Sequence, residues 1–192
     1  MLKLSTLEVG VDVPWVTSWT GEAINGAAPC ATVGGRLALF QDHAPGVGKP
    51  QYSKNHLVRQ RLSVVEMRCP MCGERTRELD RWTQIAKRRT AGELRARGGN
   101  ISSDIDDDQV LIDAGSIAPL HRRCVDRSMK YCPHLRASED VLIMRFPADW
   151  IVLPLLVRAE SGAGVAVAFL QLCGVTRTID RRWRGANGRL NA

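Results

Sequence analysis

Two pairs of residues in the sequence have the types and the spacing of metal ligands. The first pair is Cys69 and Cys72, followed directly by Gly73, and the second pair is His121 and Cys124. A structural zinc ion takes four ligands in a tetrahedron, and a Cys-x-x-Cys turn supplies two sulfur atoms on one edge of it. Residues three positions apart, as in the second pair, share one face of a helical turn. The two pairs therefore predict one structural Zn²⁺ site.

Other donors compete for these ligand positions. The first pair could instead be a redox-active dithiol. In thioredoxin-like proteins a strand-helix-strand pattern precedes such a pair, and no such pattern precedes this one. Cys132 and His134 could replace His121 if the helix that carries Cys124 is broken, because in a continuous helix they lie too far along the axis. A second metal ion would need one of these alternates together with Cys30, His43 or His56.

A treble-clef zinc finger would position both pairs, because it joins a zinc knuckle to a helix whose first turn carries the second pair. Pro119 suits a first helical turn, so the sequence predicts that helix from about Leu120 to Tyr131. Residues 109–113 predict a strand before it. The spacing of apolar residues over 77–86 predicts a short amphipathic helix.

The sequence as a whole predicts an α+β fold of short strands around the treble-clef-like zinc site. Residues 1–62 alternate short apolar runs with Gly and Pro, which predicts strands and loops without a helix. Residues 63–136 contain the zinc ligands, with an exposed polar insertion at 77–108. Residues 137–176 are apolar and predict β-structure at 141–146, at 151–157 and, as a strand or a short buried helix, at 165–172. A basic tail occupies 177–192.

The charge of the chain favours an anionic partner. Its 192 residues include 27 Lys and Arg against 20 Asp and Glu, a formal net charge of +7. Such a balance suits the phosphates of DNA or RNA. The candidate contacts are Arg59, Arg61, Arg122, Arg123, Arg127 and Lys130. The alternative is a protein-interaction or assembly module whose apolar C-terminal part binds another protein; the oligomeric state is left open.

The cysteines and the apolar stretches indicate where the protein works. Six cysteines without an N-terminal signal peptide favour a reducing compartment, so we expect a cytoplasmic protein without structural disulfides. No apolar stretch has the length of a membrane-spanning helix, so we expect no membrane association.

The sequence predicts neither a catalytic site nor an organic cofactor. Nucleases built on treble clefs place a catalytic His, often beside Asp, on the strand before the second ligand pair, where it activates water beside a metal ion. Here Asp113 is followed by Ala114, and the nearest His is the ligand His121. An HNH-like nuclease is therefore the least favoured function. The acidic run 104–108 lacks the Gly and Glu of a calcium loop, and no phosphate-binding glycine loop follows a strand.

Several motifs follow one another in a recognisable order: Val13-Pro14-Trp15, Cys69-Pro70-Met71-Cys72-Gly73, Pro119 to Cys124, and Cys132-Pro133-His134-Leu135. In this order the chain resembles an uncharacterised cysteine-rich zinc-binding family of actinobacteria and their phages. The second ligand pair of that family is typically Cys-x-x-Cys, so His121 is a departure. The resemblance implies zinc binding and an actinobacterial or mobile-element setting, without an established activity.

Overall fold

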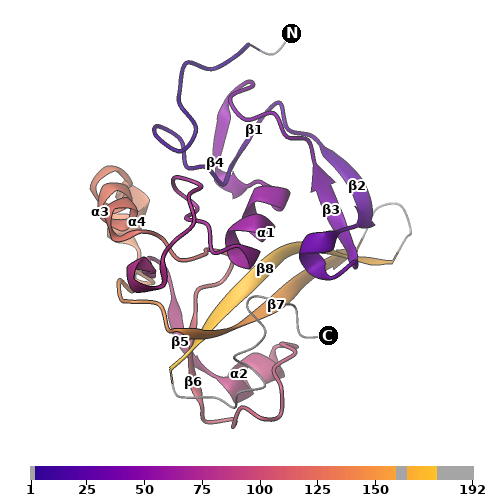
Figure 1. Cartoon of the computed structure of the whole chain (residues 1–192), viewed down its shortest axis with the longest axis vertical. Coiled ribbons are helices and arrows are strands. Elements are labelled where there is room, and N and C mark those ends of the chain that lie inside the picture. The colour runs from indigo at the N-terminus through magenta and orange to yellow at the C-terminus, as the bar shows by residue number, and fades with distance from the viewer. Residues whose placement is uncertain (1–2, 159–163, 177–192) are drawn as a thin grey trace.

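In the computed structural model, strand β8 (Val165–Val175) is the centre of the larger of two sheets. One edge of β8 pairs antiparallel with β7 (Asp149–Arg158) along its length (Figure 1). The other edge pairs with two strands, parallel with β3 (Leu37–Gln41) near one end and antiparallel with β6 (Val110–Asp113) near the other. The fold is mixed α+β, which confirms the predicted class.

The remaining strands lie at the ends of this arrangement. Strand β2 (Ile24–Pro29) pairs with β3, and β5 (Lys87–Thr90) pairs with β6. Strands β1 (Thr17–Trp19) and β4 (Pro50–Asn55) form a separate two-stranded sheet, at the N-terminal end of the molecule in Figure 1. Strands from the N-terminal, central and C-terminal segments thus share one sheet.

Helix α1 (Leu57–Val65) packs against the middle of β8. Its Gln60 is fully buried, and the side-chain amide donates to the Leu170 carbonyl at 2.7 Å and accepts from the Leu170 N–H at 2.9 Å. Arg61 donates to the carbonyl of Ala168 at 2.9 Å. These side chains supply hydrogen bonds to β8 between the positions where β3 and β6 pair with it, so the buried backbone groups there keep partners.

The position of α1 corrects two predictions. The sequence predicts no helix within 1–62, but α1 begins at Leu57. Arg59 and Arg61, predicted to contact nucleic acid, are only 1% and 0% exposed. Arg59 binds both carboxylate oxygens of Glu22, at 2.6 and 2.8 Å. Neither arginine can reach an external phosphate, because both guanidinium groups bind partners inside the protein.

The helix predicted over 77–86 is also wrong. Residues Glu78–Asp80 form a single 3₁₀ turn, η2, and the chain from Trp82 onward is extended. Trp82 forms β-bridges with Leu120 on one side and Arg145 on the other. Pairing on both sides satisfies the backbone of this segment, and this tertiary contact overrides the helical spacing of its apolar residues.

The polar insertion predicted at 77–108 is not an exposed arm. It contains β5 and helix α2 (Ala91–Ala96), which begins with a reciprocal capping box between Thr90 and Glu93. Its apolar side chains are buried in a second core cluster that also includes residues of β6, β7 and β8: Ala91, Leu94, Ile101 and Ile105. The acidic residues around these side chains are exposed. Apolar residues are few and scattered in this segment, so the sequence pattern did not indicate a core there.

The strands predicted at 109–113 and 151–157 are confirmed as β6 and part of β7, and 165–172 lies in strand β8. Residues 141–146 form only isolated bridges. The structure describes residues 3–158 and 164–176, so the predicted basic tail at 177–192 lies outside the described residues. Among the described helices, none has the length and apolar character needed to cross a membrane.

Candidate metal centre

The two predicted ligand pairs meet in the structure. Donor atoms of Cys69, Cys72, His121 and Cys124 all lie within 4.8 Å of one another. Sulfur atoms bound to one tetrahedral zinc ion, with bonds of about 2.3 Å, lie about 3.8 Å apart. The cluster is therefore compatible with a metal ion, and its three thiols and one imidazole are the donors that zinc prefers in structural sites.

The first pair lies on a tight knuckle. The Cys69 N–H donates to the Glu74 carbonyl, and the Gly73 N–H donates back to the Cys69 carbonyl, both at 2.8 Å. Gly73 has a φ of 78°, which only glycine adopts without strain. A Cβ at this position would also meet the Trp15 ring at 2.8 Å. The Trp15 N–H donates to the Met71 carbonyl, so the first residues of the chain pack directly on the knuckle.

The second pair lies at the start of α3 (Arg122–Tyr131). His121 is the N-cap residue, and its Nδ1 lies 3.4 Å from the Cys72 sulfur. Its Nε2 lies 3.3 Å from the Arg75 carbonyl. A histidine that binds a metal through Nδ1 donates its Nε2–H to such an acceptor, which fixes the tautomer and the ring orientation.

A distant residue caps α3 because the His121 side chain faces the other ligands. Asp80, on η2, accepts the Arg122 N–H at 2.9 Å through its Oδ1. Such a contact satisfies one of the free N–H groups at the helix start and places a negative charge at the positive end of the helix. Nothing in the sequence indicates this contact, because Asp80 is far from α3 along the chain.

We expect Asp80→Ala to lower the free energy of unfolding by about 1 kcal/mol, the usual cost of losing a helix cap. Urea denaturation of the metal-loaded protein measures it. Glu78→Ala on the same 3₁₀ turn is the matched control, because it removes a similar charge without removing a cap. Equal stability of the Asp80→Ala variant and the wild type would show that the cap is not needed.

The thiols interact strongly with one another. A hydrogen bond with the Cys124 thiol, together with backbone N–H groups of Cys72, His121 and Met71, lowers the pKa of Cys69 to about 5. The same hydrogen bond raises the pKa of Cys124, and burial raises that of Cys72. Binding of a metal by all three thiolates must therefore release protons, so metal affinity falls with falling pH.

Arg123 lies beside these thiols on α3. Its guanidinium donates to Glu74 at 2.6 Å. The neighbouring Glu74, and then Cys124 and Cys72, raise the pKa of Arg123. Its positive charge would offset part of the negative charge of three metal-bound thiolates.

The alternate ligands lie elsewhere. α3 ends at Tyr131, Cys132 is its C-cap, and Pro133 begins a short second helix, α4 (Pro133–Ala137). The helix is thus interrupted before Pro133, as the alternative ligand set required. The interruption lies at the end of α3 opposite to the ligand pair. Neither Cys132 nor His134 belongs to the cluster of donor atoms, whereas His121 does.

A second group of donors, Glu22, His43 and His56, also lies within 4.8 Å. Two of its members, Glu22 and His56, already have partners. Both oxygens of Glu22 bind Arg59, and the His56 Nδ1 accepts the Arg59 N–H as the cap of α1. The His56 Nε2 lies 2.9 Å from the carbonyl of Asp42. These internal bonds occupy the Glu22 and His56 atoms that a second metal would need.

The remaining predicted cations are exposed on α3, each with a partner. Arg122 pairs with Asp126 at 2.9 Å, Arg127 donates to the Val11 carbonyl, and the Lys130 ammonium lies 5.1 Å from the centre of the Tyr131 ring. Asp113 is the residue at the position where a treble-clef nuclease would carry its catalytic pair. It accepts hydrogen bonds from Gly115 and Gln171 and is not among the clustered donors.

Comparison of the chain with protein-family models, with curated proteins and with solved structures finds no match. The resemblance to a cysteine-rich family of actinobacteria and phages therefore stays a prediction.

Proposed function

We propose that the chain is a non-catalytic binding module folded around one structural Zn²⁺, held by Cys69, Cys72, His121 and Cys124. The observation that supports this is the convergence of three sulfur atoms and one imidazole nitrogen from two segments far apart in sequence. Four protein ligands complete a tetrahedron and leave no position for a reactive water, as in structural zinc sites.

The local packing explains why an ion would be needed. The hydrophobic cluster beneath α3 has four buried members, Cys69, Leu120, Cys124 and Val125, and two of these are proposed ligands. It has fewer buried members than either of the other two core clusters that the structure describes, so hydrophobic burial stabilises it less. The bonds to zinc would join the knuckle, with Trp15 packed on it, to the first turn of α3. This knuckle-and-helix arrangement is the treble-clef-like element of our proposal.

Metal analysis of the purified protein tests the proposal. We expect one equivalent of zinc in the wild type and its loss in Cys69→Ser and His121→Ala. Cys132→Ser is the matched control, because it removes a thiol outside the cluster, and it should keep the metal. Two results would overturn the proposal. One is a wild-type protein that contains no zinc although it was produced with ample zinc and kept reduced. The other is full zinc content in both ligand variants.

A further inference from the structure

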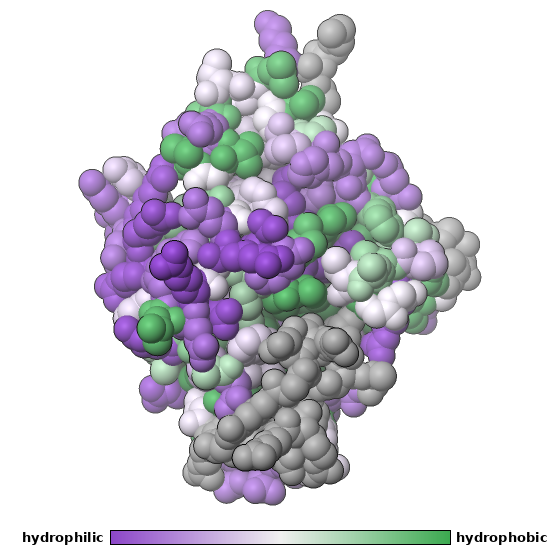
Figure 2. All heavy atoms as spheres, in the orientation of Figure 1, coloured by the Kyte–Doolittle hydropathy of each residue, from purple (hydrophilic) through white to green (hydrophobic). Residues whose placement is uncertain are grey.

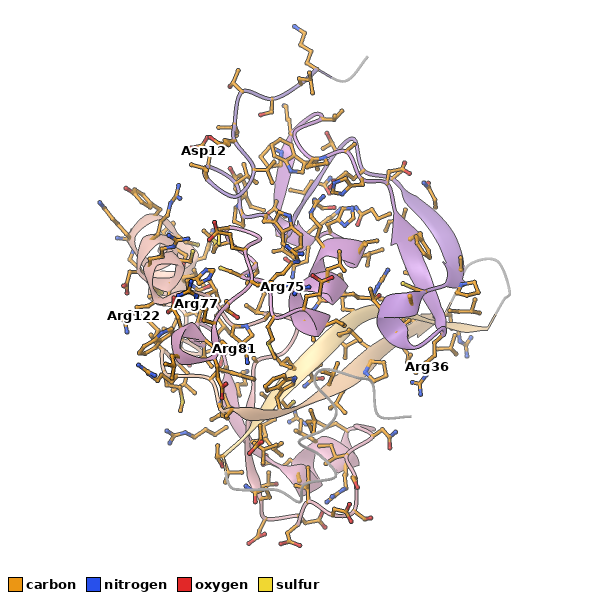
Figure 3. All side chains as sticks on the ribbon, in the orientation of Figure 1. Asp12, Arg36, Arg75, Arg77, Arg81 and Arg122 are labelled. Atoms are coloured by element: carbon orange, nitrogen blue, oxygen red, sulfur yellow. The ribbon has the colours of Figure 1, made fainter. Side chains whose placement is uncertain are left out.

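Four arginines belong to the segments that meet at the candidate metal centre or at Trp82, and we call them the arginine face: Arg75, Arg77, Arg122 and Arg145. All four are exposed. Figure 3 shows Arg77 and Arg122 close together at the edge of the molecule next to α3, with Arg75 nearer its centre. Figure 2 shows hydrophilic residues gathered on the same side.

Specific contacts tie the members of the face together. The backbone carbonyl of Arg75 lies against His121, the residue before Arg122. The carbonyl of Arg77 accepts the N–H of Asp80, whose carboxylate caps α3 at Arg122. The face therefore depends on the geometry of the metal centre, because the proposed zinc ligand His121 sets the start of α3.

Trp82 holds two of these cations in place. The guanidinium carbons of Arg122 and Arg145 lie 4.9 and 5.5 Å from the centre of its ring. Trp82 is itself half-buried and packs on the small hydrophobic cluster beneath α3. Cation–π contacts restrict the two side chains before any partner arrives, which lowers the entropy lost on binding.

The cations of this face are available to an external anion. Arg77 and Arg145 form no ion pair with any residue that the structure describes. Arg75 pairs with Glu66, and Arg122 pairs with Asp126, but the two arginine side chains are 69% and 49% exposed. Pairs of this kind contribute about 0–1 kcal/mol, so a phosphate can replace either carboxylate at small cost.

We propose that the arginine face binds the phosphate backbone of double-stranded nucleic acid without reading its sequence, an inference that rests on the proposed zinc module. Every cation of the face is an arginine, and the planar guanidinium donates two parallel hydrogen bonds to a phosphate. The residues come from separate segments and together form an extended surface, which suits a row of phosphates better than a single carboxylate.

Fluorescence anisotropy with a labelled DNA duplex of about 20 base pairs, at about 50 mM salt, tests the proposal. We expect binding that weakens steeply with salt. The variant Arg77→Ala/Arg145→Ala should lose at least about tenfold in affinity, and its log–log salt slope should fall by about 2, because two phosphate contacts are lost. Arg36→Ala is the matched control, since Figure 3 places Arg36 on the opposite side of the molecule. It should bind within about twofold of the wild type.

Three results would overturn the proposal: no binding of the duplex at low salt, equal losses in the Arg36→Ala control and the double variant, or displacement of the duplex by polyglutamate at matched charge. The last result would indicate an acidic protein partner. Zinc content is measured in the same samples. A zinc-loaded wild type that ignores DNA contradicts only the arginine face, whereas a zinc-free wild type that binds DNA through these arginines contradicts only the zinc module.

Discussion

Removal of zinc by a chelator at neutral pH should unfold the knuckle and α3 while the large sheet stays folded. Structural zinc contributes folding free energy on the order of 10 kcal/mol in small zinc modules, and the hydrophobic cluster beneath α3 is too small to replace it. The large sheet is held by the pairing of β7 with β8, by the main core cluster and by the bond from Gln60 to Leu170. None of these involves a proposed zinc ligand, so the sheet should not depend on the ion.

Amide hydrogen exchange separates these two parts of the molecule. After chelation, the N–H groups of α3 and of the knuckle, including Cys69 and Gly73, should exchange much faster, whereas those of β8 should stay protected. Re-addition of zinc should restore protection, and Cys132→Ser should behave like the wild type. Unchanged exchange in α3 after complete loss of zinc would show that the ion is not structural.

Glu22→Gln should lower the free energy of unfolding by about 3–5 kcal/mol, because it leaves the buried Arg59 guanidinium without its counter-charge. The side chains of Glu22 and Arg59 are 0% and 2% exposed, and they share two hydrogen bonds. Urea denaturation measures the loss. Asp126→Asn is the matched control, because it breaks the exposed pair with Arg122 and should cost no more than about 1 kcal/mol. Equal losses in the two variants would contradict the account.

The same buried pair predicts how stability depends on pH. Burial alone would raise the pKa of Glu22, but the bonds from Arg59 and the Trp19 N–H outweigh it and lower this pKa below its ordinary value. A carboxyl with a lowered pKa in the folded state stabilises the protein above its unfolded pKa of about 4.3, and the effect is lost as pH falls. Below about pH 4, the free energy of unfolding should therefore fall less steeply with pH in Glu22→Gln than in the wild type.

His56 adds a second component at higher pH. Burial is the main cause of its lowered pKa. The unfolded chain therefore takes up a proton on this side chain near pH 6.5, whereas the folded protein takes it up only at a lower pH, so stability falls as the pH drops through that range. The free energy of unfolding of the wild type should decrease when the pH is lowered from 7 to 5. The decrease should be smaller in His56→Gln, because this variant has no titrating group at this position.

The sequence predicted the cluster of four donor residues better than the surface around it, for physical reasons. The ligand pairs are local patterns, because Cys69 with Cys72 and His121 with Cys124 are each set by one turn of chain. Burial of a charge is not local. Arg59 and Arg61 have the same sequence character as Arg77, and only the position of Glu22 and of the β8 carbonyls distinguishes them.

The fold shows the same division. Strand β6 could be predicted from a short run of apolar residues, whereas α2 is short and has few apolar residues. Its Thr90–Glu93 capping box was the one local signal that could have identified it. The extended segment at Trp82 depends on partners at Leu120 and Arg145, which no pattern within the segment reveals.

X-ray absorption at the zinc edge of the purified, fully loaded protein tests the proposed ligand set. The wild type should show three sulfur ligands at about 2.3 Å and one nitrogen ligand at about 2.0 Å. In His121→Ala, the nitrogen contribution should disappear from whatever zinc the protein retains. Four sulfur ligands in the wild type would mean that Cys132 replaces His121, and a water or carboxylate oxygen would mean an open, non-structural site; either result would contradict the account.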